Sequence, residues 1–123
     1  MQDHPNAAIV RKGLQGMSTG DLESVNDLLD DDIVWHEIGR SEPRQGKAAL
    51  MAADSSSDYE ITATVHDVVA NDEHAVALVD AHATRGGKTL DYRTAEIMHM
   101  RDGKAIERWA FSDDTARIVE FFK

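Results

Sequence analysis

The stretch YEITATVHDVVANDEHAVALVDAHATRGGKTLDYRTAEIMHMRDGKAIERWAFS, residues 59–112, decides the fold. It contains four long runs with β-branched and aromatic residues, separated by the short polar or glycine-bearing links NDE, GGK and RDGK. Such links between extended runs are typical of β-hairpins. We therefore predict a meander of four consecutive antiparallel strands, over residues 59–70, 74–85, 89–100 and 105–112.

Helical patterns surround this meander. Apolar residues recur at helical spacing in the first thirty residues and again after the turn-rich segment GRSEPRQG. Ser112 and two aspartates suit the start of a last helix, because a hydroxyl caps it and acids favour its positive end. The predicted elements outside the meander are helices over 5–17, 18–29, 47–53 and 112–122, and one strand over 31–38.

This order of elements predicts a single α+β domain over residues 1–123. Helices that precede and follow a run of antiparallel strands pack on one face of the sheet. We expect a cone-shaped, curved antiparallel sheet with helices packed on its concave face. The apolar interior of such a cone is a common place for a small-molecule site.

Composition excludes several classes of protein. The net charge of −10 repels phosphate backbones and anionic lipids, so we expect no nucleic-acid and no membrane partner. The absence of cysteine excludes a disulfide scaffold, a thiol nucleophile and a thiolate metal site. The segment MQDHPNAAIV lacks the pattern of a signal peptide, and no run approaches the ~20 apolar residues of a membrane span. We expect a cytoplasmic protein.

Several strings, taken together and in order, resemble the nuclear transport factor 2-like superfamily, above all its SnoaL-like and ketosteroid isomerase-like branches. The strings are GDLESVNDLLDDDIVWHEIG, SEPRQGKAAL, GGKTL, RDGK and RWAFSDD, which span nearly the whole chain. The resemblance implies a cystatin-like, nuclear transport factor 2-like fold and a homodimer. It does not choose an activity, because the fold hosts isomerases, cyclases, dehydratases, hydrolases and non-catalytic binders.

The resemblance also implies positions for functional residues. In ketosteroid isomerases a Ser-Glu-Pro-Arg turn follows the strand that carries the catalytic base, an aspartate. Matching SEPRQG to that turn, with one extra residue near Arg40, places His36 at the base position. Matching EIMHM, with one residue of slack after Thr89, places Glu96 at the acid that donates to an oxyanion. The family's tyrosine on the first helix corresponds to Gly13, so its hydroxyl is missing.

Two interpretations remain open for each of these residues. His36 is either a general base or a histidine packed at a strand end and hydrogen-bonded to the backbone. Glu96 alternates with Thr94, Met98 and Met100, so these four side chains share one face of a strand. Glu96 either points into a cavity, where it donates to an oxyanion or pairs with His36, or lies on a solvated face.

A further set of side chains is expected to contact the substrate. On the last strand Glu107 alternates onto the same face as two aromatic residues, which form either a cavity wall or ordinary core. Tyr92 and Arg93 are alternatives for the missing oxyanion hydroxyl. The residues predicted to bind the substrate are Leu14, Met17, Met98, Trp109 and Phe111.

The sequence predicts neither a metal site nor a cofactor. No pair of histidines has the i, i+4 spacing of a helical zinc motif, and the Gly-Gly-Lys-Thr of residues 86–89 joins two strands rather than a strand and a helix. We expect a cofactor-independent acid–base enzyme of the isomerase or cyclase type that acts on a small apolar carbonyl compound. The alternative is a non-catalytic small-molecule-binding module. Steroid isomerisation is disfavoured, because Gly13 removes the tyrosine.

Overall fold

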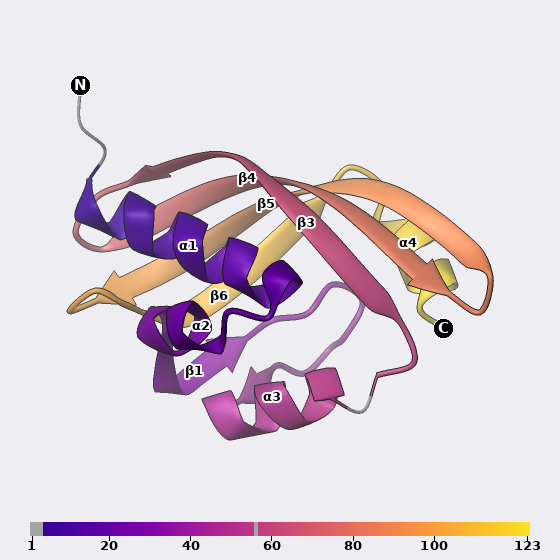
Figure 1. Cartoon of the computed structure of the whole chain (residues 1–123), viewed down its shortest axis with the longest axis horizontal. Coiled ribbons are helices and arrows are strands. Elements are labelled where there is room, and N and C mark those ends of the chain that lie inside the picture. Colours follow the sequence, from indigo (N-terminus) through magenta and orange to yellow (C-terminus); the bar gives the residue numbers. More distant parts are fainter. Residues whose placement is uncertain (1–3, 56) are drawn as a thin grey trace.

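The described residues form four helices and a curved six-stranded sheet that is covered by helices on one face (Figure 1). The computed structural model describes residues 4–55 and 57–123. The helices are α1 (Pro5–Thr19), α2 (Leu22–Leu28), α3 (Lys47–Ser55) and α4 (Thr115–Phe121). The strands are β1 (Leu29–Trp35), β2 (Arg44–Gln45), β3 (Glu60–Ala70), β4 (His74–Arg85), β5 (Lys88–Arg101) and β6 (Lys104–Ser112).

The sheet has the strand order β2-β1-β6-β5-β4-β3. Strands β3 to β6 pair in sequence as an antiparallel meander, as predicted. The tight turn between β4 and β5 needs positive φ at both Gly86 (56°) and Gly87 (82°), which glycine adopts without strain. Strand β1 is parallel to β6, so the sheet is mixed in this one pair. Strand β1 also ends at Trp35, which is earlier than predicted, and His36 lies directly beyond it.

Helix α1 begins and ends with local signals in the chain. The His4 side chain accepts a hydrogen bond from the Asn6 N–H, and Pro5 occupies the first turn, where a missing N–H costs nothing. The helix ends at Gly20, whose φ of 81° is left-handed and whose N–H bonds to the Gly16 carbonyl. The predicted helix is therefore confirmed and extends two residues further.

The sheet face that carries the helices is here called the interior face. Its core side chains on β3, β4 and β5 pack against apolar side chains of α1, which lies across β3 and β4 (Figure 1). These sheet residues are Val65, Val68, Ala75, Ala77, Val79, Met98 and Met100. The predicted α+β class, with helices on the concave face of a curved sheet, is confirmed.

The opposite face of the sheet is here called the outer face. No described helix covers its middle, and it exposes Val69 (62%), Leu78 (44%) and Phe111 (59%). An uncovered apolar sheet face of this kind is common where another surface binds.

The sequence predicts neither a membrane span nor a signal peptide, and the structure bears on the first of these. None of the described helices is both long and apolar enough to cross a membrane. The expectation that the chain begins without a leader falls partly on residues 1–3, which lie outside the described residues.

Candidate functional site

A buried ion pair lies on the interior face. Arg108 Nε donates to Glu96 Oε1 at 2.9 Å, and Arg108 Nη2 lies 2.8 Å from the same oxygen. Both side chains are only 10% exposed. Glu96 comes from β5 and Arg108 from β6, where Arg108 pairs with Met98, two residues beyond Glu96 on the same face. The pair is therefore held by adjacent strands and not by a loop, which fixes its geometry.

Arg108 is held on three sides. Its Nη1 donates to the main-chain oxygen of His36 at 2.9 Å, and its guanidinium lies 4.0 Å from the centre of the Trp35 ring. Such a cation–π contact stabilises a desolvated guanidinium. An arginine has five N–H donors, so donors remain for a further oxygen.

One oxygen of Glu96 takes no part in the pair with Arg108. Its Oε2 has no hydrogen-bond partner among the described residues, and it is not among their fully enclosed polar atoms. A guanidinium 2.8 Å from Glu96 favours the carboxylate form, in which the two side chains carry opposite charges. The arrangement therefore suits Glu96 as a proton acceptor, in contrast to the protonated donor that the family resemblance implied.

Tyr92 lies on the same face of β5 as Glu96, four residues away. Burial, with a smaller contribution from the negative charge of Glu96, raises the pKa of Tyr92 to about 12. The phenol consequently stays protonated at neutral pH and is able to donate a hydrogen bond. Arg93 points to the outer face, where it pairs with Asp80 at 3.1 Å in an exposed position. Of the two alternatives for the missing hydroxyl, only Tyr92 faces the interior.

The sheet separates His36 from Glu96. His36 Nε2 lies 2.8 Å from Glu107 Oε2, and its ring stacks on Trp109 with centroids 5.0 Å apart and planes at 6°. Glu107 and Trp109 pair across the sheet with His99 and Ile97, which face outward. The possible His36–Glu96 pair is therefore not formed, and His36 has a different carboxylate partner on the outer face.

The outer-face histidine nevertheless keeps one nitrogen free. Among the described residues, His36 Nδ1 has no hydrogen-bond partner, and the side chain is 33% exposed. His99 lies near the same carboxylate, with Nδ1 3.9 Å from Glu107 Oε1, and its ring meets Trp109 edge-on at 4.9 Å. The group formed by His36, His99, Glu107 and Trp109 is thus a half-buried surface cluster.

The residues predicted to bind the substrate do not come together. Leu14 and Met98 are buried in the core beneath the interior face, with 4% and 0% exposed. Met17 lies near the end of α1 and is 39% exposed. Trp109 and Phe111 share a face, as predicted, but it is the outer face, so they cannot contact a ligand beside Glu96. This orientation follows from the pairing of β6 with β5, which sets Arg108 and Ala110 inward.

Gly13 explains why the family's tyrosine has no counterpart. A Cβ atom at this position would lie 2.5 Å from Cδ2 of Leu28, a fully buried side chain of α2. The space above the interior face at this point is therefore occupied by the contact between α1 and α2. A ring on α1 at residue 13 would require the second helix to move away.

A second acid–arginine pair lies near the first. Arg44 on β2 and Arg108 on β6 both pair with Trp35, one on each side of β1. Arg44 Nη2 donates to Glu37 Oε2 at 3.2 Å, and its buried Nε has no partner among the described residues. Positive charge is therefore present on both sides of Trp35.

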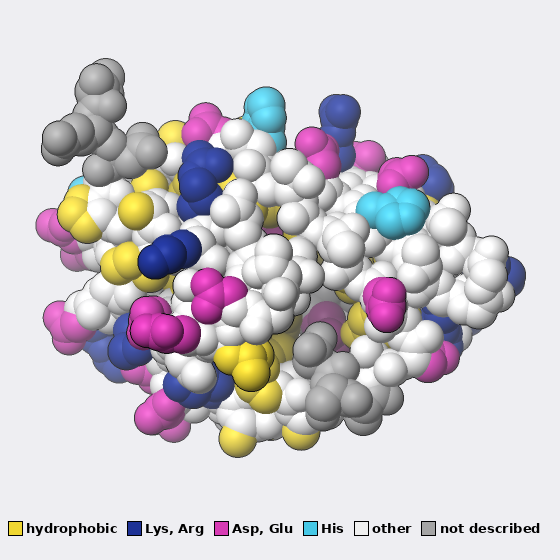
Figure 2. Space-filling model, viewed as in Figure 1, with side chains coloured by type: hydrophobic (Ala, Val, Ile, Leu, Met, Phe, Trp, Pro, Cys, Tyr) yellow, Lys and Arg dark blue, Asp and Glu magenta, His cyan; other side chains and the backbone are white. Residues whose placement is uncertain are grey.

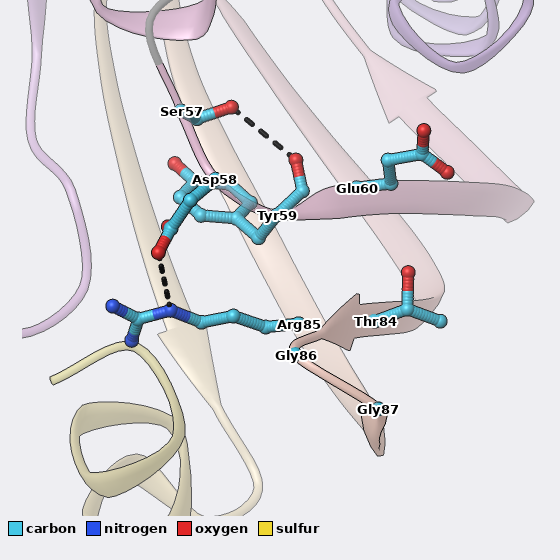
Figure 3. Close-up of a pocket in the computed structure, with 8 residues that line it drawn as sticks. All are labelled: Ser57, Asp58, Tyr59, Glu60, Thr84, Arg85, Gly86 and Gly87. Atoms are coloured by element: carbon cyan, nitrogen blue, oxygen red, sulfur yellow. Dashed lines mark hydrogen bonds and ion pairs between the residues drawn. The ribbon is translucent and has the colours of Figure 1, made fainter.

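The surface of the described residues is hollowed in several places (Figure 2). Figure 2 shows the helix-covered side hollowed between α3 and β3, with hydrophobic side chains and an acidic side chain visible inside. A separate hollow of about 430 Å³ lies between residues 57–60 and the hairpin 84–87 (Figure 3). Another, of about 340 Å³, lies on the loop 39–42. Neither of the two measured hollows is lined by Glu96 or Arg108.

No metal centre is formed by the described residues, in which no group of three or more histidine or acidic side chains is arranged to hold an ion. Among the described residues, the polar groups on the interior face include a carboxylate oxygen of Glu96, the guanidinium of Arg108, and the hydroxyls of Tyr92 and Thr94. These groups can accept a proton, bind a carbonyl oxygen and donate a hydrogen bond, respectively.

Sequence reasoning missed Arg108 and Trp35. The signal for Arg108 was available, because it lies between Glu107 and Trp109 and must face away from them in a strand. Trp35 directly precedes His36 and must likewise face away from it. What the alternation alone did not show was which of the two faces carries the helices.

The fold is that of nuclear transport factor 2-like proteins. A structure of a nuclear transport factor 2-like protein of unknown function from Burkholderia pseudomallei is similar, with a TM-score of 0.82, 18% identity and 98% of both chains covered. A family model described as a SnoaL-like domain matches residues 10–108, so the chain belongs to the SnoaL-like domain family.

Two more solved structures are similar over nearly their whole length. Bal32a, from a soil-derived mobile gene cassette, has a TM-score of 0.82 at 25% identity, with 97% of both chains covered. TerC, co-crystallised with polyporic acid, has a TM-score of 0.81 at 19% identity, with 97% of this chain and 98% of TerC covered. No curated protein sequence matches the chain.

Proposed function

We propose that the chain is a cofactor-independent acid–base enzyme, of the isomerase or cyclase type, that acts on a small apolar carbonyl compound at the interior face. The observation that carries the proposal is the buried Glu96–Arg108 pair, in which Glu96 Oε2 is left for a substrate. Apolar side chains, among them Met98 and Trp35, surround the pair. Membership of the SnoaL-like family and the polyporic acid of the TerC crystal also support a small organic ligand.

The pair suits proton abstraction next to a carbonyl. Glu96 Oε2 takes the proton from the carbon, and the electron pair of the broken C–H bond forms an enolate whose oxygen is held by Arg108. Negative charge then moves from Glu96 to the enolate while the same guanidinium stays beside it. No unpaired charge is created in the interior, which keeps the barrier low. Return of the proton to another carbon gives an isomer. Alternatively, the enolate carbon attacks a second carbonyl, whose π electrons move to its oxygen, and the new alkoxide takes the proton back from Glu96, which gives a ring.

The test compares two carboxylates of the same sheet. We expect the parent protein to speed the incorporation of solvent deuterium beside the carbonyl of octanone, as followed by NMR. Glu96→Gln should lower that rate by about 10²–10⁴-fold, the usual contribution of a positioned base. The matched control Glu107→Gln removes a carboxylate from the outer face and should leave the rate unchanged.

The alternative base is tested in the same assay. His36→Ala should retain the parent rate, because the ring lies on the outer face beside Glu107. If His36→Ala loses the activity and Glu96→Gln keeps it, the reaction takes place at the outer cluster and the proposal for Glu96 is wrong. Thermal unfolding of each variant checks that the fold is intact.

A non-catalytic binding module is the second candidate. It is favoured by the engagement of Nε, Nη1 and Nη2 of Arg108, which ties the end of β1 to β6 and β5. In that case the interior binds a small apolar ligand and Glu96 only neutralises Arg108. Saturable binding of octanone without deuterium exchange in the parent would favour this candidate.

We also propose that two copies of the chain pair through the outer face. The support is the uncovered apolar surface around Leu78, Ile97 and Phe111, together with the homodimer implied by the family resemblance. The rim of this face carries both signs of charge, in the pairs Arg93–Asp80 and His82–Asp91. In a two-fold interface the same patch of both copies meets. The acidic side chains of one copy can then lie beside the basic side chains of the other.

A further inference from the structure

The C-terminal segment closes one end of the interior face. The ring of Phe122 meets Tyr59 edge-on, with centroids 4.8 Å apart, and meets Tyr92 edge-on at 6.4 Å. Tyr92 belongs to β5, and Tyr59 directly precedes β3, which is the edge strand on the far side of β4. Phe122 therefore lies between two separated strands, in ring contact with Tyr92 of the interior face.

An arginine fixes the position of Phe122. Arg85 Nη1 donates to the main-chain oxygens of Phe121 and Lys123, at 3.1 and 2.6 Å, and its Nε donates to Asp58 Oδ2 at 3.1 Å. We call this arrangement the Arg85 clasp. Figure 3 shows the guanidinium beside the C-terminal segment, with Asp58 reaching it from the start of β3. Charge-assisted hydrogen bonds on both sides of Phe122 leave its main chain little freedom.

The distance between this end and the ion pair is defined by the strand. Tyr92 and Glu96 are four residues apart on one face of β5, which corresponds to about 13 Å at the usual rise of a strand. A ligand with its carbonyl at Arg108 and its apolar part running along β5 would reach Tyr92 and then Phe122. The raised pKa of Tyr92 agrees with a poorly solvated end of the interior.

We propose that Phe122 is the end wall of the interior site and sets the longest ligand that the site accepts, with Arg85 as the residue that positions it. The ligand class is an apolar carbonyl compound whose apolar part extends from the carbonyl by up to about 13 Å, the span along the strand. The proposal rests on the proposed function only in placing the carbonyl at Arg108.

The experiment measures ligand length. In a Trp109→Phe background Trp35 is the remaining tryptophan, and its fluorescence reports binding of straight-chain methyl ketones from hexanone to dodecanone. Phe122→Ala should strengthen binding of the longest ketones by about tenfold, the value of about two buried methylenes, and leave the shortest unchanged. Phe122→Trp should weaken the longest ketones. Opposite shifts from the two variants are not expected of a residue that only stabilises the fold.

Matched variants test the two parts of the proposal. Arg85→Ala should shift the length limit in the direction of Phe122→Ala, because the clasp is lost, and Arg85→Lys should restore it in part. Phe111→Ala removes the same ring from the outer face and should change nothing. The end wall would be overturned if Phe122→Ala changed the affinity for ketones of every length equally. It would also be overturned if Phe111→Ala shifted the length limit as Phe122→Ala does.

A second readout separates the end wall from the proposed function. If the parent binds no ketone, the carbonyl site is wrong, but access to the interior can still be measured by acrylamide quenching of Trp35. Phe122→Ala should then raise the quenching constant, whereas Phe111→Ala should not. Unchanged quenching in Phe122→Ala would overturn the end wall, whatever the outcome with ketones.

Discussion

At the scale of single residues, Gly13 shows how the absence of a side chain determines a contact. The helix α1 approaches α2 so closely that a Cβ at residue 13 would lie 2.5 and 2.6 Å from two carbon atoms of Leu28. The same contact excludes the tyrosine that related isomerases carry on this helix. A phenol hydroxyl on the interior face comes from Tyr92 on β5.

Gly13→Ala should therefore destabilise the protein, although alanine is the better helix former by about 1 kcal/mol. Forcing an atom into a packed core costs about 1–3 kcal/mol, so the net change in the free energy of unfolding should be unfavourable. Urea denaturation measures it. Gln15→Ala, at an exposed position of the same helix, should change little. A more stable Gly13→Ala variant would show that α2 shifts without cost.

The residue scale also shows how far the site was predictable. Alternation correctly grouped Thr94, Glu96, Met98 and Met100 on one face of a strand. It could not choose the covered face, because the opposite side carries Ala95 and Ile97, which are also apolar. Alternation therefore allows a single cavity that contains both His36 and Glu96. In the structure, the sheet lies between the two side chains. The roles proposed for these residues stay predictions.

At the scale of elements, α1 protects the exposed edge of the sheet. Strand β3 is the last strand in the order and has no neighbour on one side. Ser18 Oγ accepts a hydrogen bond from the Ala63 N–H at 2.7 Å, and Arg11 Nη1 donates to the Val65 carbonyl at 3.3 Å. Two side chains of one helix thus hydrogen-bond to a backbone N–H and a backbone carbonyl of the edge strand. Left unpaired, such groups could form a sheet with a strand of another chain.

Ser18→Ala should leave the Ala63 N–H without its partner. We expect a loss of about 1 kcal/mol in the free energy of unfolding, the usual net value of one hydrogen bond. Hydrogen exchange should become faster at the Ala63 amide and stay unchanged at other amides of β3. A general loss of the helix would instead speed exchange at many amides. Thr19→Ala, at an exposed neighbouring position, is the control. Unchanged exchange at Ala63 would contradict the protective role.

At the scale of the whole molecule, the two faces of the sheet differ in what covers them. The interior face packs against α1, α2 and α3 (Figure 1) and holds Glu96 and Arg108. The outer face lacks such a layer and exposes large apolar side chains. An acidic chain with a net charge of −10 would repel its own copies unless a surface such as this one offset the repulsion.

Phe111→Asp should therefore convert a dimer into a monomer. Phe111 is 59% exposed on the outer face, and a buried, unpaired carboxylate at an interface is costly. Light scattering after size-exclusion chromatography measures the mass. Leu22→Asp, at a residue 62% exposed on α2, is the matched control and should stay dimeric. A parent protein that is monomeric at all concentrations would contradict the dimer.

The sequence by itself determined the meander, the helices around it and the grouping of side chains along each strand. The physical reason is that hairpin links and residue periodicity act locally, within a few neighbours. The tertiary structure alone decided which grouping faces the helices. The parallel pairing of β1 with β6 brings Trp35 beside Arg108 and turns His36 outward. Such pairing depends on residues more than seventy positions apart, and no local pattern records it.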